Sequence, residues 1–446
     1  MKDSISINNI SKFNKDFNSN PTNKITRNAL TRSQINNIAM DWDAFRKVDH
    51  SYSDVISTEM KKVTNQKASG RCWGFAGLNL MRISLAEKYN LADFEFSQNY
   101  FMFFDKLEKS NYFLENILQT LDESYDSRIM MHLLNSPVQD GGQWDMFVNL
   151  IEKYGVVPQS VMAESVQSSQ SRAMNQFLTR KLREFASVLR LMNNNGKNIS
   201  DLRNEKEKMM SEIYSMLCIC LGDPPTKFDW QTRDKKNKFI RITDLSPVEF
   251  YKKHCNVELK DKICLIHAPM SNKKMNELYT VSFLGNVVGG QIIKYANVEI
   301  DDIKDAAVKS IKNNESVWFG CDVGKMFHRE LGLMDMDLYN YDALFGTTFP
   351  MSKATRLEYG DSMMTHAMLF TGVDMIKGKP RRWRVENSWG VKGGDKGYYL
   401  MTDKWFDEYN YEIVVDKKYL PKRILDLFEK EPVALAPWDP MGALAI

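Results

Sequence analysis

Four side chains that together can break an amide bond occur in this 446-residue chain. Gln66 stands six positions before Cys72, and His366 and Asn387 follow far downstream. A thiol can attack a carbonyl carbon while an imidazole moves the proton and a neutral carboxamide orients that imidazole. The Gln66 side chain and the Cys72 backbone N–H can hold the oxyanion that forms. The pattern therefore predicts thiol-based acyl transfer with Cys72, His366, Asn387 and Gln66 as the catalytic set.

Each of these residues also has a purely structural interpretation. A lone cysteine is more often a small buried hydrophobic residue than a nucleophile. Here the joint occurrence of Gln66, Trp73, His366 and the Asn387–Gly390 motif favours the nucleophile. His366 is preferred among six histidines because it begins an apolar run that would hold it rigidly; the others, expected at the surface or in the core, are His50, His132, His254, His267 and His328. No metal-ligand pair of the Cys-x₂-Cys or His-x₃-His type lies near Cys72 or His366, so we expect no metal and no cofactor.

The sequence resembles the papain-like cysteine peptidases and, within them, the bleomycin hydrolase and aminopeptidase C branch. The resemblance runs along the whole chain, in residues 63–82, 140–145, 152–158, 362–374, 384–389 and 437–445. It implies an α+β fold with a helical half, a β-rich half and a cleft between them. Secreted papain-like enzymes commonly have a disulfide cysteine three positions before the nucleophile. Here that position is Ser69, which agrees with a reducing compartment.

The resemblance also implies substrate-binding residues. In the related enzymes the segment matching Asp140-Gly141-Gly142-Gln143 pairs with an extended substrate, although a plain turn is the structural alternative. Trp389 is expected beside the substrate, where it shields the bond between His366 and Asn387 from water.

The C-terminal residues 431–446 are the segment that distinguishes this branch. In the related enzymes this arm lies in the cleft, and its terminal carboxylate binds the substrate's amino group. Without the resemblance the tail would be interpreted as a frayed end. The chain ends Ala445-Ile446, so the carboxylate that meets the substrate belongs to Ile446 or, after self-trimming, to Ala445.

The pattern of apolar residues predicts the elements that position these groups. Apolar residues at Ala76, Leu80 and Ile83 mark one helical face, and Cys72 would open that helix. A cysteine at a helix start has a lowered thiol pKa, because unpaired N–H groups stabilise the thiolate. Short apolar runs at 366–370 and 384–386, bounded by Gly372 and Gly390, predict strands.

His366 follows Cys72 by 294 residues, against roughly 130–150 in small papain-like enzymes. We therefore expect a helical insertion at 165–260. Its first helix is marked by Leu178, Leu182, Phe185 and Leu189, and its second by Met209, Ile213, Met216 and Cys220. The chain is thus divided into an N-terminal arm packing on the body (1–60), a helical half (61–164), the insertion (165–260), a β-rich half (261–430) and a C-terminal arm (431–446).

A protruding helical pair buries its apolar stripe poorly unless a second chain covers it, which favours oligomerisation. The resemblance implies a homohexamer. The alternative is a helical lid packed on its own chain.

Composition excludes several classes of function. The formal net charge of +3 is too small to favour a nucleic-acid partner, and no segment approaches the roughly 18 apolar residues of a membrane span. Six cysteines lack the spacing of a disulfide framework, so we expect the cytoplasm.

These observations predict a cytoplasmic, cofactor-free cysteine aminopeptidase that acts on peptides with a free N-terminus. Alternatives are a broader endopeptidase or amide hydrolase, and a nucleic-acid-binding protein with secondary peptidase activity.

Overall fold

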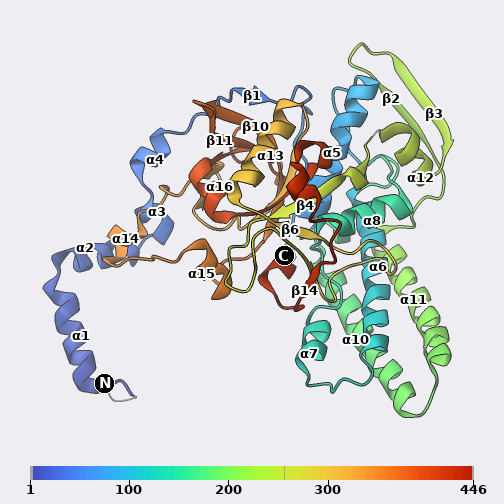
Figure 1. The fold of residues 1–446 in the computed structure, drawn as a ribbon, viewed down its shortest axis with the longest axis horizontal. Coiled ribbons are helices and arrows are strands. Elements are labelled where there is room, and N and C mark those ends of the chain that lie inside the picture. The colour runs from blue at the N-terminus through green and yellow to red at the C-terminus, as the bar shows by residue number, and fades with distance from the viewer. Residues whose placement is uncertain (1–3, 256, 444–446) are drawn as a thin grey trace.

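The computed structural model describes residues 4–255 and 257–443 (Figure 1). One half of the body is helical and the other is built on a long, mostly antiparallel sheet. The helical half contains α5 (Cys72–Tyr89), α6 (Gln98–Gln119), α7 (Arg128–Asn135), α8 (Trp144–Tyr154) and α9 (Val166–Ser169).

The central helix is α5, which begins at Cys72 as the sequence predicted. It packs against α6 and α8 on one side and against strands of the sheet on the other, so nearly all of its side chains are buried. Gly74 and Gly77 are needed there, because a Cβ atom would lie 2.4 Å from the Phe101 ring and 2.6 Å from the Phe147 ring respectively. The helix is thereby held rigidly between the two halves.

The predicted insertion forms two long helices, α10 (Arg172–Asn194) and α11 (Ile199–Leu221), which project together from the body (Figure 1). Leu178, Leu182, Phe185 and Leu189 are buried as predicted. On α11 the buried positions after Ile213 are Leu217 and Leu221; Met216 and Cys220 are only half-buried. The predicted face is therefore confirmed at Met209 and Ile213 and is wrong by one residue at the C-terminal end of the helix.

The apolar stripes of both helices pack on α6 of the same chain. A second chain is not needed to bury them, so the physical argument that linked these helices to oligomerisation does not apply. The pair packs on its own chain, as the alternative interpretation stated.

A hairpin and several short helices lead from the insertion to the sheet. Trp230 in the hairpin packs edge-to-face on Phe250, with ring centroids 5.4 Å apart. The elements are β2 (Phe228–Arg233), β3 (Phe239–Leu245), α12 (Pro247–Phe250), a π-helix (Tyr251–Cys255) and a 3₁₀ turn (Leu259–Asp261).

The large sheet has the strand order β14-β5-β6-β4-β13-β7-β10-β11-β12-β9-β8, and β1 (Asp54–Val55) pairs with β10. The strands are β4 (Lys262–Ile266), β5 (Glu277–Val281), β6 (Tyr295–Asn297), β7 (Val317–Cys321), β8 (Phe327–His328), β9 (Leu333–Met334), β10 (His366–Ile376), β11 (Lys379–Glu386), β12 (Tyr398–Thr402), β13 (Asn410–Asp416) and β14 (Val433–Leu435). Strand β10 starts at His366 but runs through Gly372, which does not end it as predicted.

Helices α13 (Ile300–Lys312) and α16 (Asp403–Tyr409) contribute to the second apolar core, together with β7, β10 and β11. Shorter elements complete this half: α14 (Tyr341–Phe345), α15 (Lys353–Glu358), α17 (Lys422–Leu425) and two 3₁₀ turns (Lys417–Tyr419 and Pro440–Gly442). Because β7 and β10 also contact α5, the sheet joins the helical half directly to the strand that begins with His366.

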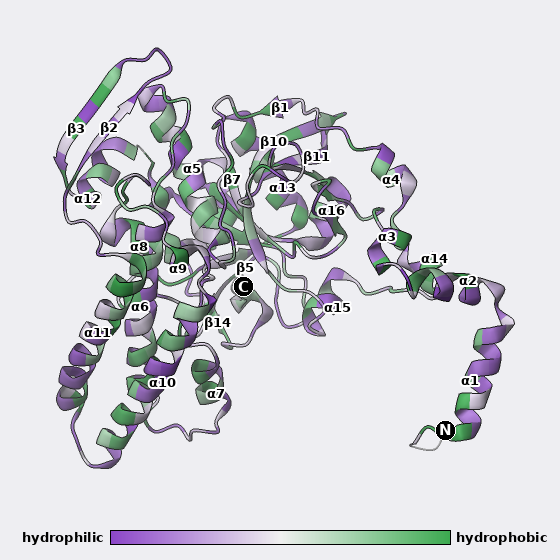
Figure 2. Cartoon of the chain, turned by 180° about the vertical axis from the view of Figure 1, so that it is seen from behind, coloured by the Kyte–Doolittle hydropathy of each residue, from purple (hydrophilic) through white to green (hydrophobic). Residues whose placement is uncertain are grey.

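The N-terminal segment differs from the expected arm packed on the body. Helices α1 (Ile7–Ser19) and α2 (Pro21–Leu30) have no buried residue, and α1 extends away from the rest of the chain in both views (Figures 1 and 2). Only the following helices, α3 (Ile35–Ala39) and α4 (Trp42–Arg46), bury a side chain each.

Among the described residues, no helix combines the length and apolar character that crossing a membrane requires. All six cysteines are free thiols.

Candidate active site

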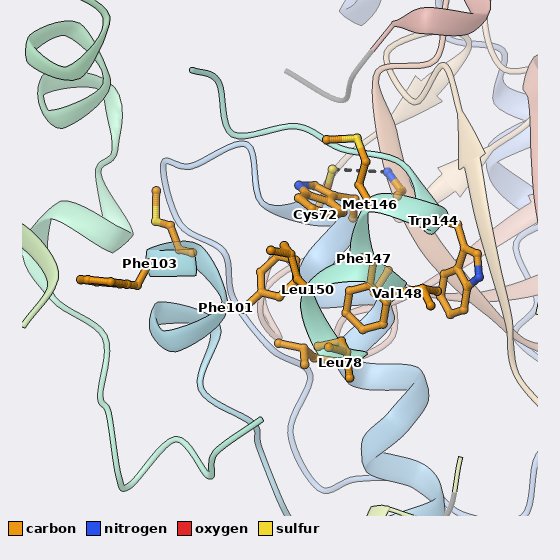
Figure 3. Close-up of a cluster of buried hydrophobic side chains, with 14 of the residues drawn as sticks. Cys72, Leu78, Phe101, Phe103, Trp144, Met146, Phe147, Val148 and Leu150 are labelled. Atoms are coloured by element: carbon orange, nitrogen blue, oxygen red, sulfur yellow. Dashed lines mark hydrogen bonds between the residues drawn. The ribbon is translucent and has the colours of Figure 1, made fainter. Parts of the chain in front are cut away.

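Cys72 is the first residue of α5, and its sulfur lies against the strand that carries His366. The Ala367 backbone N–H donates to Cys72 Sγ at 3.4 Å, and Figure 3 shows the sulfur at the edge of the buried cluster around α8. The preceding residue, Arg71, donates from both terminal nitrogens to Glu164, at 2.9 and 2.7 Å. This buried ion pair holds the turn that presents the thiol.

The predicted partner residues meet across two neighbouring strands. His366 begins β10 and Asn387 follows the last residue of β11, and these strands pair antiparallel. His366 Nε2 lies 2.9 Å from Asn387 Oδ1, and the Ser388 backbone N–H donates to the same oxygen at 2.7 Å. An oxygen acceptor assigns the proton to Nε2, which leaves Nδ1 able to accept one. Sheet pairing thus orients the imidazole for proton transfer.

Trp389 covers the imidazole. Its ring centroid lies 4.8 Å from that of His366, and the Arg329 guanidinium lies 4.4 Å from the Trp389 ring. The indole excludes water from the bond between His366 and Asn387, which strengthens it. In the structure Trp389 therefore supports His366, as well as standing beside the cleft.

Gln66 is held next to these residues by the motif that contains Asn387. Its backbone N–H donates to Ser388 O at 2.9 Å, and its Oε1 accepts from Ser388 Oγ at 2.6 Å. Nε2 donates one hydrogen to Ser69 O at 2.6 Å, and its second hydrogen has no partner in the described chain. That second N–H is available to an oxyanion.

Burial controls the charges of the two reacting groups. Desolvation raises the pKa of Cys72 to about 12, although N–H groups of Ala367, Trp73 and Cys72 itself act in the opposite direction. Desolvation also lowers the pKa of His366 to about 4, although the hydrogen bond that the ring donates to Asn387 acts in the opposite direction. Desolvation therefore outweighs the lowering of the thiol pKa that was expected at the helix start. Burial therefore acts against the charged form of both groups, the thiolate and the imidazolium.

The Asp140 side chain is fully engaged with residues of its own chain. Its carboxylate pairs with buried Lys106 at 2.6 Å and accepts from Gly70 N at 2.9 Å and Asn175 Nδ2 at 2.7 Å, as well as from Ser171. Burial alone would raise the pKa of Asp140, but the Lys106 ammonium and these hydrogen bonds hold it below the usual range. The carboxylate thus braces the loop against α6, the start of α10 and the turn before Cys72.

The two glycines of the loop sit on Trp73 and Lys109. A Cβ atom at Gly142 would lie 2.6 Å from the Trp73 ring, so only glycine fits there. Trp73 Nε1 donates to Asp140 O at 2.6 Å, and Lys109 Nζ donates to Gly141 O at the same distance. These bonds to backbone oxygens fix the path of the loop beside Cys72.

Gln143 connects this loop to the C-terminal arm. The side chain is fully buried, and its Nε2 donates to Ala443 O at 2.8 Å. The arm is also fixed by an ion pair between Lys273 and Asp439 at 2.6 Å and by Arg128 over the Trp438 ring at 3.8 Å. The predicted contacts of Ala445 and Ile446 lie outside the described residues. As far as Ala443, the arm reaches the loop next to Cys72.

The sequence analysis missed the lysines behind the site. Lys106 and Lys109 lie on α6 and are buried, and Lys109 pairs with Asp105 at 2.7 Å. The available signal was four charged residues between Phe103 and Phe113, namely Asp105, Lys106, Glu108 and Lys109, because buried lysines occur almost only with partners. Ser388 was inside a recognised motif, but its bond to Gln66 could not be inferred from spacing.

The other histidines lie elsewhere, and the described residues contain no group of three side chains suited to a metal ion. His267 contacts Lys353 at 3.0 Å and His328 accepts from Leu331 N at 3.2 Å.

Comparison with known sequences identifies close relatives. A model of the Peptidase C1-like family matches residues 4–442. Aminopeptidase C of Listeria innocua is 45% identical over 446 residues and 100% of each chain. Bleomycin hydrolase of Mus musculus is 45% identical over 444 residues, covering 98% of each chain, and that of Homo sapiens is 45% identical over 437 residues, covering 96% of each.

A solved structure agrees over the full length. The crystal structure of PepW from Lactobacillus rhamnosis HN001 superposes with a TM-score of 0.98, at 46% sequence identity and with complete coverage of both chains.

Proposed function

The chain belongs to the Peptidase C1-like family, and from that premise we propose that Cys72 acts as the nucleophile that releases the first residue of a peptide. Relatives named aminopeptidase C and bleomycin hydrolase, similar over the whole length, make it a cysteine-type aminopeptidase. What we add is the assignment of roles to residues and the way in which the free N-terminus is selected.

The first half of the reaction forms a thioester. Cys72 Sγ attacks the carbonyl carbon of the first residue while its proton passes to Nδ1 of His366. The oxyanion receives hydrogen bonds from the Cys72 N–H and the second Nε2 hydrogen of Gln66. His366 then gives the proton to the departing amine as the C–N bond breaks. Transfer of the proton from the thiol to the imidazole leaves the net charge of the site unchanged. This order of steps therefore suits two groups whose charged forms are disfavoured by burial.

The second half returns the enzyme to its starting state. Water attacks the thioester, His366 accepts a proton from that water, and the C–S bond breaks. The released amino acid leaves, and the proton returns to Cys72 Sγ. Asn387 keeps the imidazole oriented through both halves and is a positioning residue, since it contacts the ring and not the substrate.

We base the selection of a free N-terminus on one observation, the hydrogen bond from Gln143 Nε2 to Ala443 O. It supports a position of the arm directly beside the loop that borders Cys72. An arm there limits the peptide on the N-terminal side of the cleaved bond to one residue. The terminal carboxylate, three residues further on, would then meet the substrate ammonium as a charge-assisted pair.

The test compares fluorogenic leucyl amides with a free and an acetylated amino group. Wild type should cleave the free compound, and Cys72→Ala should cleave neither while remaining folded. Removal of residues 443–446 should increase cleavage of the acetylated compound relative to the free one by at least tenfold, because the barrier and its charge are gone. Val433→Thr, an exposed change on the arm, is the matched control and should leave the ratio unchanged.

Two results would overturn the proposal. Activity in Cys72→Ala would contradict the assignment of Cys72 as the nucleophile. An unchanged ratio of acetylated to free amide cleavage after truncation would contradict the role of the arm in selection. Equal cleavage of both compounds by wild type would instead indicate an endopeptidase.

We further propose a cytoplasmic homohexamer. The free state of all six thiols supports a reducing compartment. The apolar residues of α1 support association, since Ile7 is 83% exposed and Ile10 55% exposed on a helix that contacts little of its own chain. A second copy of the chain is the partner that would cover them.

A further inference from the structure

We propose that the guanidinium of Arg329 binds a carboxylate on the second residue of the peptide, the residue that departs with the amine. Dipeptides with a free carboxyl end carry such a group, and so do longer peptides with aspartate or glutamate in second position. The inference rests on the proposed function and deepens it, because it assigns a substrate class to the leaving-group side of the site.

Arg329 lies in the turn between β8 and β9, and this turn is fixed against the segment that follows Trp389. The Gly394 backbone N–H donates to Glu330 O at 3.0 Å. The ring of Phe327, at the start of β8, lies 6.0 Å from the Trp389 ring, measured between centroids. The backbone that carries Arg329 is therefore held beside Trp389.

The indole of Trp389 connects Arg329 to the histidine that protonates the leaving amine. The Trp389 and His366 ring centroids are 4.8 Å apart, and Arg329 Cζ lies 4.4 Å from the Trp389 ring. Arg329 Cζ is therefore no further from the imidazole centre than the sum of these distances, 9.2 Å. Burial is the main cause of the lowered pKa of His366, and the positive charge of Arg329 contributes to it.

The departing amine has to come to this side of the cleft. His366 gives its proton to that nitrogen, so the two nitrogen atoms must lie about 3 Å apart during the reaction. In the proposed arrangement the arm, which Gln143 holds at Ala443, borders the other side of the cleaved bond. An extended residue spans about 3.5 Å, so a carboxylate on the second residue comes close to Trp389 and to the guanidinium above it.

The guanidinium is available to such a group. Arg329 is exposed and Trp389 is half-buried. Among residues 4–255 and 257–443 no carboxylate forms an ion pair with Arg329, whereas Lys325 on the same loop pairs with Asp361 at 3.3 Å. A guanidinium stacked on an aromatic ring keeps its N–H groups free, because they lie in its own plane. Arg329 thus offers a planar fork that can donate two hydrogen bonds to one carboxylate.

The experiment measures kcat/KM from the release of leucine, with the full-length enzyme at low ionic strength. Leucyl-glycine is compared with leucyl-glycinamide, and the α-amide of leucyl-glutamate with the α-amide of leucyl-glutamine. Within each pair the two peptides differ by one carboxylate, at the chain end in the first pair and on the side chain in the second. Because both peptides meet the same enzyme, any effect of Arg329 on the His366 pKa cancels in their ratio.

Arg329→Gln should lower the ratio of charged to neutral cleavage about two- to fivefold in at least one pair, as expected for an ion pair at an exposed site. Arg329→Glu should lower that ratio further, because it repels the carboxylate. Arg329→Lys keeps the charge and should retain part of the ratio, which separates recognition of charge from packing on Trp389. Arg180→Gln removes an exposed charge on α10 and is the matched control.

The outcomes separate this inference from the proposed function. If no peptide is cleaved in a Cys72-dependent way, the proposed function fails and the inference fails with it. If the peptides are cleaved, a fall confined to the glycine pair assigns the terminal carboxylate as the ligand, and a fall confined to the glutamate pair assigns the side chain.

Three results would overturn the inference while leaving the proposed function intact. Both ratios could be the same in wild type and Arg329→Gln, Arg180→Gln could change them equally, or Arg329→Lys could lose as much as Arg329→Glu. Raising the salt concentration should bring the ratios of wild type and Arg329→Gln closer together, because exposed charges are screened.

Discussion

At the scale of single residues, the site combines reactive groups whose charges are suppressed by burial with neighbours that orient them. Burial raises the pKa of Cys72 and lowers that of His366, while the hydrogen bond to Asn387 fixes which ring nitrogen is protonated.

Asn387→Ala should reduce kcat by about ten- to a hundredfold with little change in KM. A hydrogen bond to an ionised partner is worth about 1.5–3 kcal/mol, and the imidazolium exists only during the reaction. Steady-state kinetics on the leucyl amide measure both constants.

Asn387→Asp tests whether residue 387 acts on the His366 ring or only supports the fold. A carboxylate beside the ring favours the protonated imidazole and raises the pKa of His366. The acidic limb of the rate profile should therefore move to higher pH. If kcat fell strongly but the pH profile did not shift, the assigned contact between Asn387 and His366 would be contradicted.

His267 provides a test of stability against pH. Burial lowers its pKa to about 3, and the adjacent Lys353 acts in the same direction. Because the unfolded pKa is about 6.5, the unfolded chain binds a proton below that pH and the folded chain does not until about pH 3. The free energy of unfolding therefore falls as the pH decreases through this range.

His267→Gln keeps an oxygen acceptor for Lys353 Nζ but does not titrate. Thermal unfolding should show the variant losing less stability than wild type between pH 6.5 and pH 5, by about 1.7 kcal/mol. Parallel curves for the two proteins over that interval would show that His267 does not stay neutral in the fold. Between pH 7 and 8 the two curves should run parallel, which serves as the control.

At the scale of elements, Asp140 joins four segments that lie far apart in the sequence. Its carboxylate contacts α6 through Lys106, the residues around the start of α10 through Ser171 and Asn175, and the turn before Cys72 through Gly70. The loop that borders the substrate thus takes its position from the helical half.

Asp140→Asn should destabilise the fold by about 3–5 kcal/mol, because it leaves the Lys106 ammonium buried without its counter-charge. Urea unfolding measures the loss. Adding Lys106→Met to Asp140→Asn should restore part of the stability, since the uncompensated charge is removed. Asp305→Asn, an exposed change on α13, should have almost no effect; an equally small effect at Asp140 would refute the bracing role.

At the scale of the whole molecule, the two ends of the chain behave differently. The C-terminal arm is tied to the body by Lys273, Arg128 and Gln143 and reaches the cleft. The N-terminal helices α1 and α2 leave the body and bury no residue within the described chain. As far as Ala443, one end is packed on the body, and the other leaves apolar side chains such as Ile7 and Ile10 exposed.

Replacing Ile7, Ile10 and Phe13 by serine should weaken the proposed hexamer, because these exposed side chains form the apolar part of α1. Light scattering coupled to size exclusion should then detect smaller species. Lys12→Ser with Lys15→Ser alters polar residues of the same helix and is the control. A hexamer that survives the triple change would place the contact elsewhere, and a wild-type monomer would contradict the assembly itself.

Much of the site could be predicted from the sequence because its chemistry admits few residue types. Three of its features are local: the spacing of Gln66 and Cys72, the helix that starts at Cys72, and the strand that starts at His366. Local periodicity also located α10 and α11. The exact buried face of α11 was predicted less well, since it depends on how that helix lies on α6.

By itself, the sequence determined which groups could react and in which order they occur along the chain, because nucleophile, base and amide are properties of residue types. Only the tertiary structure decided their charges and surroundings. Burial outweighed the helix-start effect at Cys72, and the Asp140 carboxylate paired with Lys106 of α6. These outcomes depend on desolvation and on contacts between distant segments, which local spacing does not encode.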